Sequence, residues 1–234
     1  MKVNVSSPHK GVIYAREWVY KNCDKSTLLL LSGGSTPKPL YETLAKEKKL
    51  NAGAVALVDE RYGFPFHNQS NEKMIRDTGL FSFCTKQKIP VCKILHGKSI
   101  EQTAEDYNTQ IIHLFSEFPK RIAILGIGSD GHIAGIAPQR EDFHNPLFDA
   151  DQNHLVGSFI DPKPMDKGGF GARVTITFAA IRKTTARLLL AFGENKKDAL
   201  LKMRKIGPIE EIPARILMQK DITENTTILT DQRI

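Results

Sequence analysis

The stretch LLLLSGGSTP, residues 28–37, decides the fold of this chain. Four consecutive leucines have the length of a fully buried strand, and the polar, glycine-rich residues that follow end it. The proline at position 37 fits the first turn of a helix that begins directly afterwards. A buried strand, a glycine turn and a helix in this order form the unit from which parallel α/β sheets are built.

The same alternation continues along the rest of the sequence. Short apolar runs predict strands at 28–31, 55–58, 122–125, 188–192 and 228–230, and an alternating run predicts a half-buried strand at 174–178. Apolar residues at helical spacing predict helices at 9–23, 37–48, 101–116 and 195–204. This order predicts one doubly wound, Rossmann-like α/β domain over residues 1–234, with a mostly parallel sheet and helices on both faces.

The composition excludes several classes of protein. With 41% hydrophobic and 25% charged residues, the 234-residue chain has ordinary globular usage. No apolar run approaches the roughly 18 residues of a membrane helix, and the first residues lack the core of a signal peptide. The three cysteines, Cys23, Cys84 and Cys92, form no CxxC pair and fit a reducing compartment. We therefore expect a cytoplasmic protein with no membrane partner.

The net charge of +7 favours anionic partners. However, the 33 Lys and Arg residues are scattered among 26 acidic ones, and no helix-turn-helix, zinc-finger or RNP pattern is present. We expect no nucleic-acid partner. The charge fits either a solvated basic surface or the binding of a small phosphorylated substrate.

The first polar motif is the glycine-rich turn at residues 32–37. Its paired glycines, Gly33 and Gly34, let backbone N–H groups approach an anion, while Ser35 and Thr36 add hydroxyls and a helix N-cap. Such a turn before a helix predicts a phosphate site. The motif is neither GxxxxGK[ST] nor GxGxxG, so it gives no support to a nucleotide. The alternative is a plain strand-to-helix turn.

A second polar motif, VDER at residues 58–61, follows the next predicted strand and is followed in turn by Ser70-Asn71. Arg61 is suited to bidentate binding of phosphate or carboxylate. Charges at a strand end are rarely buried without partners, so an internal salt-bridge cluster that braces the loop is the alternative.

The third polar motif, LGIGSDGHIA at residues 125–134, follows another predicted strand. Asp130 and His132 lie two residues apart among glycines, which permit close approach of a ligand. A neutral imidazole oriented by a carboxylate can deprotonate water, so His132 is a candidate general base. The alternative is a structural histidine bonded to backbone. No further ligands lie at the spacing of a metal site, and we expect neither metal nor cofactor.

Two lone cations complete the set of candidates. Arg173 begins the predicted strand at 174–178, and Lys196 lies three residues after Gly193, near a predicted helix start. Lone cations are usually solvated, so these signals are weak. No GxSxG elbow is present, which makes a serine nucleophile improbable.

In order and spacing these motifs resemble the glucosamine-6-phosphate isomerase/6-phosphogluconolactonase family. The match runs from SGGSTP through VDERYGFP and LGIGSDGHIA to ARVTITF and GENKKDAL, about residues 30–200. The DER and SN motifs resemble the lactonase branch best. The resemblance implies hydrolysis of 6-phospho-D-glucono-1,5-lactone to 6-phosphogluconate in the oxidative pentose phosphate pathway, on a small phosphorylated sugar lactone and without a cofactor.

The stretch IAGIAP, residues 133–138, departs from both branches of the family. Lactonases usually carry a TASLFP-like stretch here, and deaminases resemble GHIAFNEP. The deaminase pattern has Glu before the proline, where this chain has Ala137, and a methyl group cannot move protons. Deaminase or isomerase action on glucosamine 6-phosphate is thus a disfavoured alternative, and a non-catalytic sugar-phosphate-binding module is another.

The resemblance also implies roles for single residues. His132 would be the general base and Asp130 would orient it, with Arg61 as the third catalytic candidate. The candidates for substrate binding are Gly33, Gly34, Ser35, Thr36, Asp59, Arg173, Lys196 and Lys163, the last from a PKP stretch at 162–164 that loosely resembles lactonases. We expect a monomer or a small homo-oligomer.

Overall fold

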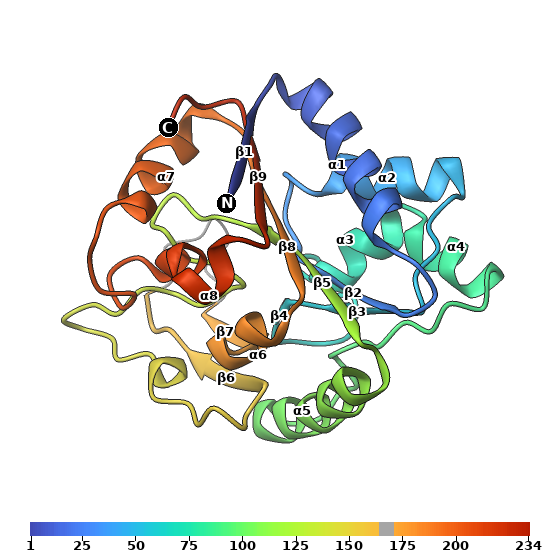
Figure 1. Cartoon of the computed structure of the whole chain (residues 1–234). Coiled ribbons are helices and arrows are strands. Elements are labelled where there is room, and N and C mark those ends of the chain that lie inside the picture. Colours follow the sequence, from blue (N-terminus) through green and yellow to red (C-terminus); the bar gives the residue numbers. More distant parts are fainter. Residues whose placement is uncertain (164–170) are drawn as a thin grey trace.

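The computed structural model describes residues 1–163 and 171–234, and its centre is a parallel sheet (Figure 1). Six strands form this sheet in the order β1-β9-β8-β5-β2-β3. Their bounds are Lys2–Val5 for β1, Thr226–Thr230 for β9, Ala186–Ala191 for β8, Lys120–Gly126 for β5, Thr27–Leu31 for β2 and Ala54–Leu57 for β3. The predicted doubly wound α/β fold is confirmed.

The leucine run that suggested the fold forms an inner strand of the sheet, next to the edge strand β3. Residues 28–31 are wholly buried within β2, which pairs with β3 on one side and β5 on the other. Each buried leucine contributes about 1.5–3 kcal/mol relative to an exposed one. A continuous apolar run suits this position because helices cover both faces of a parallel sheet.

Helices lie on either side of the six-stranded sheet (Figure 1). On one side are α1 (Pro8–Asn22) and α2 (Lys38–Glu47), and on the other are α7 (Lys197–Arg204) and α8 (Lys220–Thr223). The remaining helices are α3 (Asn71–Asp77), α4 (Leu80–Lys86), α5 (Ile100–Glu117) and α6 (Phe178–Lys183). The predicted helices are confirmed with ends shifted by a few residues; the segment 195–204, for instance, begins as a 3₁₀ turn, Glu194–Lys196, before α7.

A second sheet, which the sequence analysis missed, has three antiparallel strands. Its order is β4 (Asp59–Arg61), β7 (Ala172–Ile176) and β6 (Val156–Ile160). The predicted strand 174–178 is wrong at its end, because the hydroxyl of Thr177 accepts the N–H of Ala180 and begins α6. It is also buried on both faces rather than half-buried, since all its residues after Ala172 are buried.

Val58 joins the two sheets. Its N–H donates to Leu31 O in β2 over 2.9 Å, and its carbonyl accepts the N–H of Ile176 in β7 over 2.9 Å. The chain therefore leaves the large sheet at β3 and enters the small one at β4 within two residues. This passage places the DER motif beside the carboxyl end of β2.

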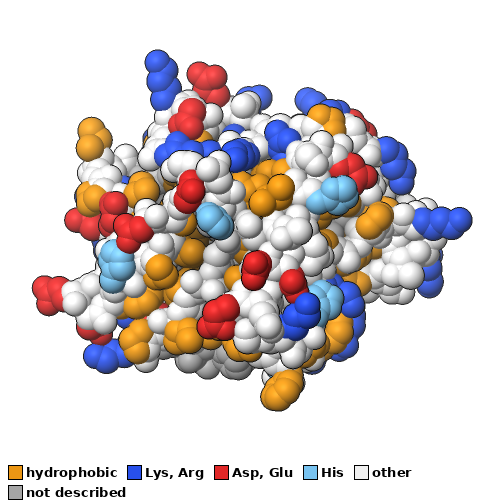
Figure 2. All heavy atoms as spheres, turned by 90° about the horizontal axis from the view of Figure 1, so that it is seen from below, with side chains coloured by type: hydrophobic (Ala, Val, Ile, Leu, Met, Phe, Trp, Pro, Cys, Tyr) orange, Lys and Arg blue, Asp and Glu red, His pale blue; other side chains and the backbone are white. Residues whose placement is uncertain are grey.

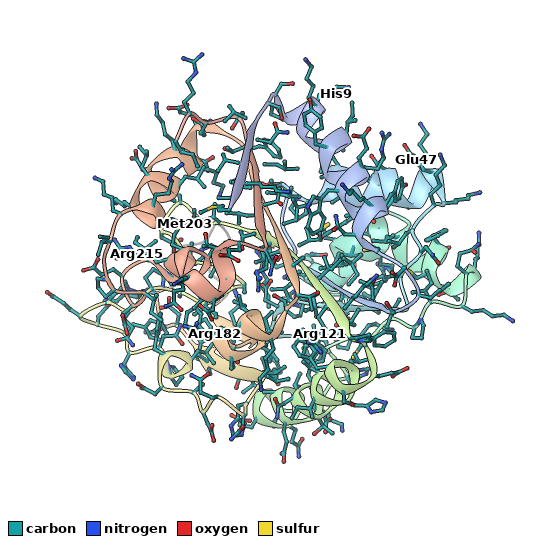
Figure 3. All side chains as sticks on the ribbon, viewed as in Figure 1. His9, Glu47, Arg121, Arg182, Met203 and Arg215 are labelled. Carbon is teal, nitrogen blue, oxygen red and sulfur yellow. The ribbon has the colours of Figure 1, made fainter. Side chains whose placement is uncertain are left out.

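The chain order reverses between β2 and β5, since β3 lies beyond β2 on one side and β5 lies on the other. Such switch points, at the carboxyl ends of the strands, are where doubly wound sheets bind ligands. Residues 32–36 follow β2 there, and residues 127–135 follow β5. In Figure 3, His9 at the start of α1 marks this end of the sheet, whereas Arg121 and Arg182 lie toward the amino-terminal ends of β5 and β8.

The surface carries charges of both signs. On the face shown in Figure 2, Lys and Arg side chains are interspersed with acidic and apolar ones. Within residues 1–163 and 171–234, none of the helices has the length and apolar character needed to span a bilayer.

Candidate active site

A cavity of about 170 Å³ opens at the switch point between β2 and β5. It is lined by Ser32, Gly33, Gly34, Ser35, Thr36, Pro37, Asp59, Arg61, Asn71, Gly126, Ile127, Gly128, His132, Ala134, Gly135 and Lys196. Most of the residues singled out in the sequence therefore meet in one place, although they come from four separate segments of the chain.

His132 lines the cavity and is paired with Asp130, which is not itself part of the lining. His132 Nδ1 lies 2.8 Å from Asp130 Oδ1, and the same oxygen accepts the backbone N–H of His132 over 3.1 Å. Burial disfavours the charged form of Asp130, but the hydrogen bonds and charge of His132 outweigh it and lower the pKa of Asp130 to about 2. An ionised carboxylate only accepts hydrogen bonds, so Nδ1 carries the proton and Nε2 keeps its lone pair in the neutral imidazole.

The loop that presents this histidine is closed by its own backbone. Gly128 N–H donates to His132 O over 2.9 Å, and Gly131 N–H donates to Gly128 O over 3.1 Å. A side chain at position 128 would lie 2.1 Å from His132 Nδ1, so only glycine lets the imidazole approach this closely. Ile133, which is wholly buried, anchors the loop in the core.

The glycine turn after β2 also lines the cavity. In the described part of the chain, the N–H groups of residues 33–36 donate no hydrogen bond within the protein. A side chain at Gly33 would lie 1.8 Å from Asn71 Oδ1, so the turn is packed tightly against α3. The expected N-cap is wrong: Pro37 occupies that position, and neither Ser35 nor Thr36 caps the helix. Their hydroxyls remain at the cavity, with the unused N–H groups that characterise an anion site.

Lys196 supplies a cation to this cavity. It ends the 3₁₀ turn after β8, and its side chain is half-buried. Burial lowers the pKa of Lys196 from its usual value, and the negative charge of Asp130 opposes that shift. A partly desolvated ammonium group interacts more strongly with an anionic ligand than an exposed one does.

Within the DER motif, Glu60 braces the loop, whereas Asp59 and Arg61 line the cavity. Glu60 is wholly buried and accepts the Ser70 hydroxyl and the N–H groups of Arg61, Asn71 and Glu72, at 2.6–2.9 Å. Burial raises the pKa of Glu60 to about 7, although these donors favour its charged form. The expected alternative of a braced loop thus describes Glu60, but the brace is made of hydrogen bonds rather than of salt bridges.

Its neighbours Asp59 and Arg61 line the cavity. Arg61 Nη1 donates to Gln69 O over 2.8 Å, which holds the guanidinium along the loop.

Two predicted binding residues lie outside the cavity lining. Arg173 is buried in β7 directly opposite Arg61 of β4, but it does not line the cavity. The Lys163 side chain is 75% exposed and its Nζ lies 3.1 Å from Asp142 Oδ2. Pro164, which belongs to the same PKP stretch, lies outside the described residues. The structure brings neither Lys163 nor Arg173 to the cavity surface.

Asn71 is the functional candidate that the sequence analysis left out of its site. Its Nδ2 donates to Asp59 O over 2.9 Å and to Asp59 Oδ2 over 3.1 Å, while its side chain packs against Gly33. It therefore connects the DER motif to the glycine turn. The signal was present, since the SN pair was noticed, but nothing in the sequence showed that the amide would meet both motifs.

A larger cavity, of about 750 Å³, lies between α1 and α2. It shares Ser35 and Thr36 with the smaller one but contains neither His132 nor Lys196, and its wall is mostly apolar. We place the chemistry in the smaller cavity because the His132–Asp130 pair, Lys196 and the unbonded N–H groups of the glycine turn meet there. Among the described residues, no three His, Cys, Asp or Glu side chains cluster as metal ligands.

The fold and the cavity define a class: a doubly wound α/β protein whose switch point combines a histidine–aspartate pair with a lysine and a turn of unbonded N–H groups. The chain belongs to the family of glucosamine-6-phosphate isomerases and 6-phosphogluconolactonases, whose model matches residues 17–228.

Individual relatives include enzymes of both names. The chain is 34% identical over 182 residues to 6-phosphogluconolactonase of Xylella fastidiosa, covering 74% of this chain and 69% of the relative. It is 27% identical over 217 residues to glucosamine-6-phosphate deaminase of Lacticaseibacillus paracasei, covering 88% and 86%. The crystal structure of 6-phosphogluconolactonase from Thermotoga maritima matches with a TM-score of 0.72, 28% identity and 98% coverage of both chains.

Proposed function

We propose that this protein is a carboxylic ester hydrolase that converts 6-phospho-D-glucono-1,5-lactone to 6-phosphogluconate. The observation that carries the proposal is that the His132–Asp130 pair and the unpaired N–H groups of residues 33–36 line or adjoin one cavity. Hydrolysis of a phosphorylated lactone needs both a base for water and an anchor for phosphate. The relatives named 6-phosphogluconolactonase support the same substrate.

The proposed chemistry begins at His132. Its Nε2 takes a proton from water while the water oxygen forms a bond to the lactone carbonyl carbon. The tetrahedral intermediate then breaks the bond between that carbon and the ring oxygen, and the imidazolium returns the proton to the departing oxygen. Asp130 stabilises the transient imidazolium and fixes the tautomer. The resulting carboxylic acid releases one proton to solvent.

The phosphate is assigned to the glycine turn and Lys196. The N–H groups of residues 33–36 and the hydroxyls of Ser35 and Thr36 supply donors, and Lys196 supplies charge. Arg61, from the small sheet, is assigned to phosphate or to the developing carboxylate, and Asp59 to substrate hydroxyls, since a carboxylate accepts from O–H donors. Arg173 is assigned a supporting place behind Arg61, and Lys163 has no place in this proposal.

The test is a pH-stat assay with freshly made lactone, in which proton release is compared with the spontaneous rate. We expect the protein to accelerate release in proportion to its concentration. A rate equal to the spontaneous one would refute the proposed function and leave the non-catalytic sugar-phosphate-binding module in its place.

The cellular setting is also a proposal. We assign the protein to the cytoplasm, as a monomer or small homo-oligomer that meets a diffusible sugar phosphate and neither nucleic acid nor membrane. Its three free cysteines support a reducing compartment. Light scattering and cell fractionation test these assignments.

A further inference from the structure

Lys196 is carried by a short turn whose far end is tied to the last strand of the sheet. The turn begins at Gly193, and the N–H of Lys196 closes it by donating to Gly193 O over 3.0 Å. Gly193 N–H in turn donates to both carboxylate oxygens of Asp231, at 2.9 and 3.1 Å. Asp231 directly follows β9, which pairs with β8 immediately before this turn.

The Asp231 carboxylate is used in an uncommon way. In the described residues it forms no ion pair with a Lys or Arg side chain; besides Gly193 it accepts only the Nε2 of Gln232, over 2.8 Å. A hydrogen bond to a charged acceptor is about twice as strong as a neutral one. The tie therefore fixes the turn from the strand side, while buried Ala199 and Leu200 fix it from the α7 side.

A lysine side chain gains binding energy from such fixation. Its long stem loses rotamer entropy on binding, and a mobile base would add the loss of backbone freedom to that cost. An anchored turn presents the ammonium group to the cavity before the ligand arrives, which reduces the cost of binding.

We propose that Asp231 is a positioning residue that holds Lys196 at the phosphate end of the cavity by tying Gly193 to the end of β9. This inference rests on the proposed function, because it takes the ligand of Lys196 to be the phosphate of the lactone. It assigns to Asp231 no contact with substrate.

Four variants test the inference: Asp231→Ala, Asp231→Asn, Lys196→Ala and the double variant of Asp231→Ala with Lys196→Ala. We expect Asp231→Ala to raise KM for the phosphorylated lactone about 10-fold and leave kcat within about 3-fold. Asp231→Asn should restore KM to within about 3-fold, because its amide oxygen still accepts the N–H of Gly193. Arg233→Ala is the matched control, since this exposed side chain lies in the same segment and has no hydrogen bond or ion pair with Asp231 in the described residues.

Two readouts separate positioning from general structural damage. Turnover of unphosphorylated glucono-1,5-lactone should be unchanged by Asp231→Ala, because this substrate has no group for Lys196. In the double variant, Asp231→Ala should add nothing to the effect of Lys196→Ala. An equal loss with both lactones, or additive losses in the double variant, would overturn the inference while leaving the proposed function intact.

The test survives two kinds of failure. If circular dichroism shows that Asp231→Ala does not fold, Asp231→Ser replaces it, since a serine hydroxyl is too short for the same tie. If the wild type does not accelerate hydrolysis, the proposed function fails, and the same variants are titrated with 6-phosphogluconate by calorimetry. Weakening by Asp231→Ala that disappears without Lys196 supports the inference; additive weakening, or no binding by the wild type, overturns it.

Discussion

The histidine loop, residues 126–137, and the glycine turn, residues 32–37, line the same cavity but differ in how their backbones are bonded. The histidine loop bonds to itself and to its surroundings: Ala214 N–H donates to Gly131 O, and the Thr175 hydroxyl donates to Ala134 O. The glycine turn leaves four consecutive N–H groups, those of residues 33–36, without a partner in the described chain. The histidine loop is held by bonds to its own backbone and to neighbouring segments, whereas the glycine turn presents a run of four donors that a ligand can satisfy.

This difference predicts a division of kinetic effects. A group held in place before substrate arrives acts mainly in the transition state, so changes in the histidine loop should lower kcat. Groups whose partners are supplied by the phosphate act in ground and transition states alike, so changes at that side should raise KM. The predictions below test this division.

The largest effect is expected from His132→Ala. Loss of the base should lower kcat by roughly 10²–10⁴, with little change in KM. His144→Ala is the matched control, because His144 also pairs with a carboxylate, Asp149, at 2.5 Å, but lies exposed outside the cavity. Steady-state kinetics on folded protein give the answer. A His132→Ala variant with wild-type kcat would show that this residue is not the base and that the histidine loop does not determine kcat.

A smaller effect, on binding, is expected from Lys196→Ala. Loss of one charged hydrogen-bond donor should weaken 6-phosphogluconate binding by about 1.5–3 kcal/mol. Its neighbour Lys197, which is exposed and lies 3.4 Å from Glu194, is the control. Because burial lowers the pKa of Lys196, its charge is lost at a lower pH than that of an ordinary lysine. Wild-type binding should therefore begin to weaken at that lower pH as the pH is raised, and Lys196→Arg should abolish this dependence. Calorimetry measures both. Equal losses of binding free energy in Lys196→Ala and Lys197→Ala would contradict the assignment of Lys196 to the phosphate.

The brace at Glu60 gives a pH-dependent contribution to stability. Its pKa is about 7 in the folded protein and near 4.5 when unfolded, so the folded state holds more protons between these values. The contribution of this group should therefore fall by about 2 kcal/mol as pH rises from 5 to 7.5. Urea unfolding of wild type and Glu60→Gln at both pH values measures it. Glu60→Gln should be less stable overall, and its stability should fall less between the two pH values than that of the wild type. An equal fall in both proteins would show that Glu60 does not titrate in this range.

No effect at all is expected with glucosamine 6-phosphate. Ala137 stands where the deaminase pattern carries Glu, and its carbonyl is bonded to Asn145 Nδ2 over 2.9 Å as part of the closed loop. An enzyme-coupled ammonia assay should stay at background. Release of ammonia together with fructose 6-phosphate would show that the protein acts as a deaminase.

Much of this arrangement could be predicted because the signals are local. The leucine run and its counterparts specify buried strands, and motifs that follow such strands must gather at one edge of a parallel sheet. That reasoning alone brings residues 33–36, Arg61, His132 and Lys196 together.

What escaped prediction depends on pairing between distant segments. A three-residue strand such as β4 has too few residues to show a period, so the small sheet was invisible. The amide of Asn71 becomes important only when α3 packs against Gly33. Lys163 was chosen for its charge and its PKP motif, but the folded chain pairs it with Asp142 on the surface, and no sequence signal marks that pairing.

The position of β9 has a consequence for the order in which the molecule can be completed. In the described chain, β1 pairs only with β9, and β9 lies between β1 and β8. Because β1 is synthesised well before β9, it must wait for β9 before it can join the sheet. Until then β8 presents an open edge, and Asp231 has not yet met Gly193. The turn that carries Lys196 is therefore completed late in synthesis, and a nascent chain lacking residues 226–234 has the histidine loop but no bond between Asp231 and Gly193.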